Sequence, residues 1–184
     1  QRQMCIRDSF HRENVPVLFG AGVEVDLMNA KAYGYYLAQS GLGMPDRDYY
    51  TRDDADACKL REQYLAHVTT MLKLLGDTPD QAAASAATVL ALETRLARAS
   101  KTRVEMRDIP KLYNKMSLAQ IKELCPGFDW GRYLKSIERP DIDDFIVTAP
   151  EFFKEMGLML REVPLADWKT YLRWQALNAY APYL

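Results

Sequence analysis

The stretch 35–50 constrains the fold most, because two pairs of bulky residues bracket a backbone that must bend sharply. The pairs are Tyr35–Tyr36 and Tyr49–Tyr50, and Gly41, Gly43 and Pro45 lie between them. Glycine and proline at this density are typical of a tight turn. A phosphate-binding loop is disfavoured, since the third glycine, the lysine and the preceding strand of the known phosphate motifs are all missing. We therefore predict a corner of the scaffold with aromatic anchors on either side.

After this corner the sequence is rich in helix signals. Asp53 or Asp54 can cap a helix that Gly76 is placed to end. The apolar positions between them recur at a spacing of three to four, as on one face of a helix: Leu60, Tyr64, Val68, Met71, Leu72 and Leu75. Thr78-Pro-Asp-Gln81 is a capping-box pattern, and it predicts a second helix to about Ala99.

Further helix starts follow in the second half of the chain. Ser117-Leu-Ala-Gln120 is another capping box, and its helix must stop before Pro126. Asp129 can cap the next helix, and we expect two more helices to start at Thr148-Ala-Pro-Glu151 and at Pro164.

The remaining segments predict little regular structure. Residues 15–27 read as a short strand or extended arm interrupted by glycines, and Asn29–Ser40 as a short helix. Residues 101–114 suggest a loop, and Phe145–Val147 a short strand. The fold class expected is mainly α, a bundle-like helical lobe over a short N-terminal extended or β element, and an incomplete domain.

Composition excludes several classes of partner. The chain has 184 residues, of which 48% are hydrophobic, and a net charge of -1 with acids and bases interspersed. No global field therefore attracts nucleic acid, and we expect none as a partner. No apolar run approaches the roughly 20 residues that cross a bilayer, and no signal segment is visible at the start.

The three cysteines do not form a recognisable framework. Cys5, Cys58 and Cys125 are odd in number and widely spaced, so a disulfide scaffold or a metal knuckle is not indicated. Buried free thiols are the preferred interpretation. A cysteine-dependent enzyme that uses Cys58 or Cys125 is a weaker alternative, because neither has a histidine nearby in the sequence.

An ordered series of segments resembles a known family. The segments are Val17-Leu-Phe-Gly-Ala-Gly-Val-Glu-Val-Asp26, Gln39-Ser-Gly-Leu-Gly-Met-Pro-Asp-Arg-Asp-Tyr-Tyr50, Leu90-Ala-Leu-Glu-Thr-Arg-Leu96, Tyr113-Asn-Lys-Met-Ser117, Pro126-Gly-Phe-Asp-Trp130 and Trp168-Lys-Thr-Tyr-Leu-Arg-Trp174. In this order they resemble the N-terminal region of the neprilysin-like zinc metallopeptidases. Residues 10–184 are predicted to be the front part of the noncatalytic helical domain, and residues 1–9 a non-matching, artefactual tail.

The resemblance implies zinc in the parent enzyme but not in this chain. A peptidase of this family needs His-Glu-x-x-His, which places two histidines on one metal and a glutamate beside the attacking water. Only His11 and His67 are present, in the strings His-Arg-Glu-Asn-Val and His-Val-Thr-Thr-Met. We therefore predict no catalytic, cofactor or metal residue in this chain and no cleavage by the chain alone.

The other candidate residues are better explained by structural roles than by metal or substrate binding. Asp141, Asp143 and Asp144 lack the glycine and distal glutamate of a calcium loop, so a solvated turn is the preferred interpretation. Asn178-Ala-Tyr180 matches the substrate-binding string of the family but lies too early in the chain, so a packing role is predicted. The methionines favour packing over metal binding: Met28, Met71, Met106 and Met159.

The function expected is that of a fragment of a secreted or periplasmic zinc metalloendopeptidase. This region would form part of the lobe that encloses the substrate cavity, so its partners would be the catalytic lobe of the same polypeptide and peptide substrates. The alternative is a free-standing α-helical interaction domain with no peptidase partner. A truncated lobe would leave apolar helix faces uncovered and would associate, whereas a free-standing domain would be monodisperse.

Overall fold

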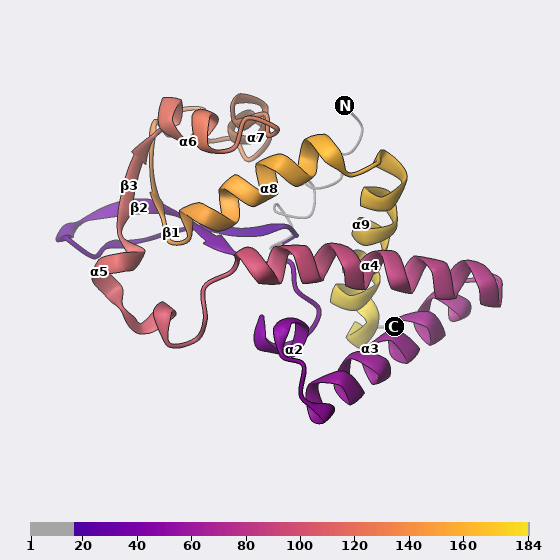
Figure 1. Cartoon of the computed structure of the whole chain (residues 1–184). Helices are drawn as coiled ribbons and strands as arrows, with labels where there is room; N and C mark the ends of the chain where they lie inside the picture. The colour runs from indigo at the N-terminus through magenta and orange to yellow at the C-terminus, as the bar shows by residue number, and fades with distance from the viewer. Residues whose placement is uncertain (1–16, 184) are drawn as a thin grey trace. The chain divides into compact units, whose positions relative to one another are not determined.

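The computed structural model describes residues 17–183, which divide into two compact units (Figure 1). Within the described residues, the first unit comprises 17–41 and 99–162, and the second comprises 42–98 and 163–183. The chain therefore passes between the units three times. The tail predicted at residues 1–9, Cys5 and His11 lie outside the described residues.

The first unit is built around a four-stranded sheet with the order β1-β2-β4-β3. Its elements are β1 (Phe19–Asp26), β2 (Asn29–Gln39), η1 (Glu105–Arg107), α5 (Ile109–Leu112), β3 (Asn114–Ser117), α6 (Leu118–Leu124), α7 (Trp130–Ser136), β4 (Asp144–Val147) and α8 (Pro150–Glu162). The β1–β2 and β3–β4 pairs are antiparallel. The β2–β4 pair is parallel, with Tyr36 opposite Ile146 and Leu37 opposite Val147.

The prediction of a helix at Asn29–Ser40 is wrong, because this segment is the strand β2. Its backbone groups pair with β1 on one side and with β4 on the other. Gly34 allows close packing there, since a Cβ on Gly34 would lie 2.5 Å from Cδ1 of Ile146. The strand expected at residues 15–27 is confirmed as β1, but Gly20 and Gly22 continue the strand and do not interrupt it.

The core of the first unit is a cluster of aromatic rings. Phe19 lies at its centre, with ring centroids 5.3 Å from Phe128, 5.5 Å from Tyr133 and 5.6 Å from Phe153. Trp130 packs on the same cluster, 4.3 Å from Phe128. Most of these rings meet edge to face, the arrangement that the aromatic quadrupole favours. The cluster joins β1 to α7 and α8.

The second unit is mostly helical. Its elements are α2 (Asp48–Thr51), α3 (Ala55–Leu74), α4 (Pro79–Ala99, whose last residue belongs to the first unit), α9 (Leu165–Tyr180) and η2 (Ala181–Tyr183). Figure 1 shows α3 and α4 as a pair of long helices with α9 against them. Their shared core is apolar: Val68, Leu72, Ala82, Ala86, Val89, Trp174 and Leu177.

Four of the predicted helix starts are confirmed by side-chain caps. The Asp54 side chain accepts from the amide of Ala57, and Gly76 takes a left-handed φ of 98° just past α3. Thr78 and Gln81 make the reciprocal bonds of a capping box at the start of α4. Ser117 and Gln120 do the same at α6, and Asp129 caps α7. The fold is mainly α with a small sheet, as the sequence predicts.

Candidate functional site

The most elaborate polar centre within either unit surrounds Glu93, a carboxylate with no exposed surface. It lies on the face of α4 that also carries Ala86, Val89 and Leu96, all fully buried. An ionised carboxylate in such a place is costly unless hydrogen bonds replace its water. The residues that supply those bonds come from three other parts of the second unit.

Three side chains donate to this carboxylate. The hydroxyls of Tyr50 and Tyr64 each lie 2.8 Å from Oε2 of Glu93. Nε2 of Gln175, on α9, lies 3.1 Å from Oε1. Glu93 therefore links α2, α3 and α9 to α4. We call these four residues the Glu93 cluster.

Each tyrosine oxygen also accepts a bond. The amide of Met44 donates to the Tyr50 oxygen over 2.8 Å, and Nε1 of Trp174 donates to the Tyr64 oxygen over 2.9 Å. Both hydroxyl protons are thereby left to point at Glu93. The cluster is a set of donor chains that converge on one acceptor.

Two opposing effects decide the protonation of Glu93. Burial raises the pKa of its carboxyl to about 7, while the hydrogen bonds from Tyr64 and Tyr50 act to lower it. Burial and the charge of Glu93 raise the pKa of both tyrosines, which therefore stay neutral donors. Because Glu93 is fully buried, it serves to join helices through hydrogen bonds and does not act on a substrate.

Gly43 brings the predicted corner into contact with this cluster. A Cβ on Gly43 would overlap the Tyr64 hydroxyl and would lie 3.1 Å from Oε1 of Glu93. The amide of Met44 and the hydroxyl of Tyr50 belong to the same stretch, 35–50. Gly41 has a φ of 83°, in the left-handed region that favours glycine. The glycines therefore serve a turn and a close approach between residues.

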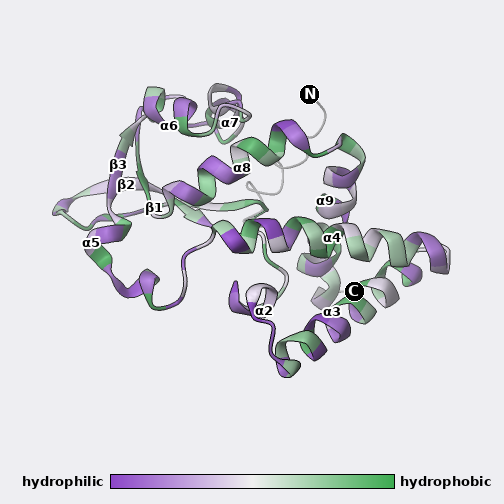
Figure 2. Cartoon of the chain, viewed as in Figure 1, coloured by the Kyte–Doolittle hydropathy of each residue, from purple (hydrophilic) through white to green (hydrophobic). Residues whose placement is uncertain are grey.

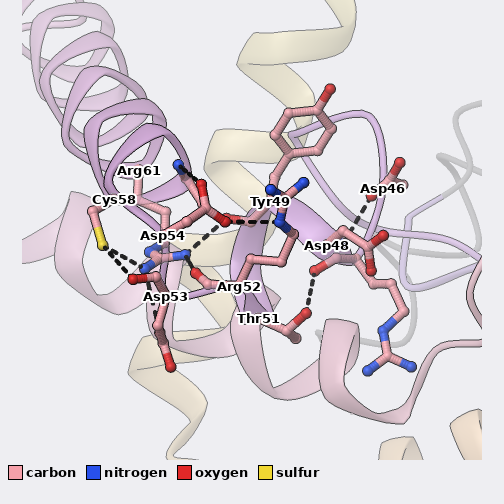
Figure 3. A network of polar contacts seen from close by, with 11 residues as sticks. Asp46, Asp48, Tyr49, Thr51, Arg52, Asp53, Asp54, Cys58 and Arg61 are labelled. Carbon is pink, nitrogen blue, oxygen red and sulfur yellow. Dashed lines mark hydrogen bonds and ion pairs between the residues drawn. The ribbon is translucent and has the colours of Figure 1, made fainter.

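A second polar network lies where α2 meets α3 (Figure 3). Nη1 of Arg61 donates to the carbonyl oxygens of Tyr49, at 3.1 Å, and Arg52, at 2.6 Å. Nη2 of Arg61 lies 3.3 Å from Sγ of Cys58 and 3.7 Å from a carboxylate oxygen of Asp53. One guanidinium thus satisfies carbonyl groups at the end of α2. Cys58 is exposed, so the prediction that it is buried is wrong, whereas Cys125 is buried as predicted.

Replacing Arg61 by Ala should lower the free energy of unfolding by about 1–2 kcal/mol, because two carbonyl groups lose a charged donor. Urea unfolding followed by circular dichroism measures this change. Lys59→Ala, at an exposed position of the same helix, is the control and should change the free energy by less than about 0.5 kcal/mol. Equal effects of the two substitutions would show that the network contributes nothing.

The structure does not gather metal ligands among residues 17–183. No group of three or more His, Cys, Asp or Glu side chains there could hold a metal ion. The ring of His67 packs edge to face on Trp174, with centroids 5.8 Å apart. The donor set of the described residues therefore does not fit a catalytic zinc, which needs three protein ligands.

The other candidates occupy ordinary structural positions. Asp141 pairs with Arg139 at 2.9 Å, and Asp144 pairs with Lys115 at 2.8 Å. Asn178-Ala-Tyr180 ends the helix α9 with Asn178 exposed and Tyr180 41% exposed, so the predicted packing role is wrong for these two side chains. Of the four methionines named above, Met159 is fully buried and Met28 is 65% exposed, while Met71 and Met106 are partly buried.

Comparison with known proteins identifies relatives over most of the chain. The sequence profile of peptidase family M13, N-terminal part, matches residues 6–184. The chain is 27% identical to mouse endothelin-converting enzyme-like 1 over 91% of its own length and 22% of the relative's. It is 27% identical to neprilysin-3 of Drosophila melanogaster, of which it covers 23%.

A solved structure supports the same relationship. The zinc metalloprotease Zmp1 of Mycobacterium tuberculosis, in an open state, superposes with a TM-score of 0.92 at 29% identity. The match covers 99% of this chain and 28% of that chain. The chain thus spans between a fifth and a third of the length of these relatives. It belongs to peptidase family M13 and corresponds to the N-terminal region of the neprilysin-like enzymes.

Proposed function

We propose that this chain is the N-terminal part of a zinc-dependent metalloendopeptidase, in which residues 10–184 help to form the noncatalytic lobe that encloses the substrate cavity. The observation that carries the proposal is the match to family M13 over residues 6–184. Several relatives are named as converting enzymes, neprilysins or zinc metalloproteases, which supports peptide hydrolysis as the activity of the whole protein.

The described residues would help to shape the substrate cavity and would not cleave the peptide bond. They offer no ligand group for zinc, so the metal and the attacking water would be held by chain beyond this region. The lobe would admit flexible peptides and exclude folded proteins. The enzyme would act outside the cytoplasm, as a secreted or periplasmic protein. No helix among residues 17–183 is both long and apolar enough to span a bilayer.

The test compares this chain with the full-length product of its locus on a fluorogenic peptide. We expect the full-length protein to cleave the peptide, to lose that activity in a zinc chelator and to regain it when zinc is added. The 184-residue chain should give no hydrolysis above the buffer rate under the same conditions. Chelator-sensitive cleavage by the short chain would overturn the proposal, and so would a full-length protein that cleaves no peptide.

A further inference from the structure

One face of the β1–β2 hairpin carries three consecutive apolar pairs between its innermost pair, Phe19 with Gln39, and the turn. Residues that lie directly opposite one another in an antiparallel pair share a face of the sheet. On this face the pairs, in order from the core outward, are Ala21 with Leu37, Val23 with Tyr35 and Val25 with Tyr33. The opposite face carries the pairs of Gly22 with Tyr36 and Glu24 with Gly34.

The first unit covers only the inner part of this face. Leu37 is fully buried, and the ring of Tyr35 packs edge to face on Phe145 at 6.0 Å. Further out, Val23 is 51% exposed and Tyr33 is 75% exposed. The row of three apolar pairs is thus covered at its inner end and exposed at its outer end.

The turn of the hairpin extends the open surface. Leu27 is 52% exposed and Met28 is 65% exposed, and Figure 2 shows the extremity of the hairpin in the hydrophobic colour. We call the five exposed apolar residues the hairpin end: Val23, Val25, Leu27, Met28 and Tyr33. Contiguous exposed apolar residues are typical of surfaces that another segment covers.

Hydrogen bonds hold this surface in one shape. The Tyr36 hydroxyl donates to the carbonyl of Val25 and accepts from the amide of Leu27, both at 3.1 Å. Asp26 accepts from the amide of Met28 at 2.8 Å and from the Tyr113 hydroxyl at 3.1 Å. The turn is therefore fixed both within itself and to the segment before β3. A preorganised surface loses less conformational entropy when it binds.

We propose that the hairpin end is a docking surface for the part of the same polypeptide that lies beyond this chain. The inference rests on the proposed function. This chain covers 28% of the solved Zmp1 chain and superposes on it with a TM-score of 0.92, so a relative of the same local fold carries much more chain. The covering segment would present aliphatic or aromatic side chains to Val23, Val25 and Tyr33.

A second copy of the chain fits the hairpin less well. Self-association through the outer edge of β1 needs a regular strand, but the register shifts between Val25 and Asp26. Such a bulge and the glycines at 20 and 22 weaken edge-to-edge pairing. These features favour a partner that packs on the face of the hairpin over a partner that pairs with the edge of the sheet.

Photo-crosslinking in the full-length protein tests the proposal. A benzophenone amino acid at position 33 should crosslink, within one polypeptide, to a segment that follows residue 184, identified by mass spectrometry. The same probe at Glu24, which is exposed on the opposite face of the same hairpin, is the control and should give at most a small fraction of that product. Crosslinks from position 33 only to a second polypeptide, or equal yields from both positions, would overturn the proposal.

A double substitution gives a second readout. V23T/Y33T keeps residues that favour strands, so the isolated chain should keep its melting temperature within about one degree, while the full-length protein should melt several degrees lower. Equal shifts of the melting temperature in both proteins would overturn the proposed docking surface.

The proposed function and the proposed docking surface can fail separately. A full-length protein with chelator-sensitive peptidase activity but no crosslink from position 33 would support the function and overturn the docking surface. If the reading frame of the locus ends at Leu184, both proposals are wrong.

Discussion

Replacing Gly43 by Ala is expected to lower the free energy of unfolding by about 3 kcal/mol, because overpacking and a lost buried hydrogen bond add together. The new Cβ would overlap the Tyr64 hydroxyl and would lie 2.8 Å from Cζ of that ring. Tyr64 cannot move away without leaving Glu93 and Trp174, to which its oxygen is bonded at 2.8 and 2.9 Å. Urea unfolding followed by circular dichroism gives the change in free energy.

A double-mutant cycle with Tyr64→Phe tests the reason for this effect. Phenylalanine removes the hydroxyl oxygen, which is the nearer of the two Tyr64 atoms that the new methyl group meets, and frees the ring to shift. The variant G43A/Y64F should therefore be more stable than the sum of the two single changes predicts, by at least about 1 kcal/mol. Gly22→Ala is the control, because nothing lies within 4 Å of a Cβ at that glycine. Strict additivity, or a Gly43→Ala effect as small as that of Gly22→Ala, would contradict the proposed contact.

The helices of this chain could be predicted because their signals are local. A cap such as Asp54, or a capping box such as Thr78 with Gln81, bonds to amides two or three residues away. The same holds for Ser117 with Gln120 at α6. Residues 101–114, expected to be a loop, contain only the short η1 and α5 before β3 begins. Thr102 and Glu105 do form a reciprocal pair of bonds at η1, but the turn there is only three residues long.

The strand β2 could not be recognised in this way, because its partners are distant in the sequence. Tyr36 pairs with Gly22 in β1 and with Ile146 in β4, 110 positions later. A segment of tyrosines and alanines with one glycine has no decisive period, so tertiary pairing determines its conformation. The bonds of Thr148 to the carbonyl of Leu37 add to this long-range set.

The Glu93 cluster was missed for a related reason, although a signal was present. Glu93 falls on the helical face that carries Ala86 and Val89, where an apolar residue is expected. A lone charged residue on a buried face predicts a polar partner inside the fold. The identity of that partner cannot be derived locally, since Tyr50 and Gln175 are 43 and 82 positions away.

The Glu93 cluster and the hairpin end support different parts of the proposed function. The cluster fixes α2, α3, α4 and α9 as one body, which a lobe must be if it is to enclose a cavity. The apolar side chains of the hairpin end are exposed, and an exposed apolar surface is typical of a segment that packs against another part of the protein. The acceptor at the centre of the cluster is thus satisfied within the second unit, while the hairpin end of the first unit is exposed.

Glu93 should make the stability of the second unit fall as the pH rises from about 4.5 to about 7. Its pKa is raised by burial to about 7 in the folded chain, so the folded state binds a proton that the unfolded state has released in this interval. The contribution is fully present below the unfolded pKa and is lost as the pH rises through the folded pKa. The shift corresponds to a change on the order of 3 kcal/mol between the two limits.

The comparison of wild type with Glu93→Gln isolates this contribution, because every other titrating group is common to both proteins. Urea unfolding at pH 5 and pH 8 should show wild type losing about 2–3 kcal/mol relative to the variant over that range. Glu62→Gln, at an exposed position on α3, should show a difference of less than about 0.5 kcal/mol. A wild type that instead gains stability relative to Glu93→Gln as the pH rises would mean that the donors outweigh burial, so that the carboxylate is held ionised in the folded chain.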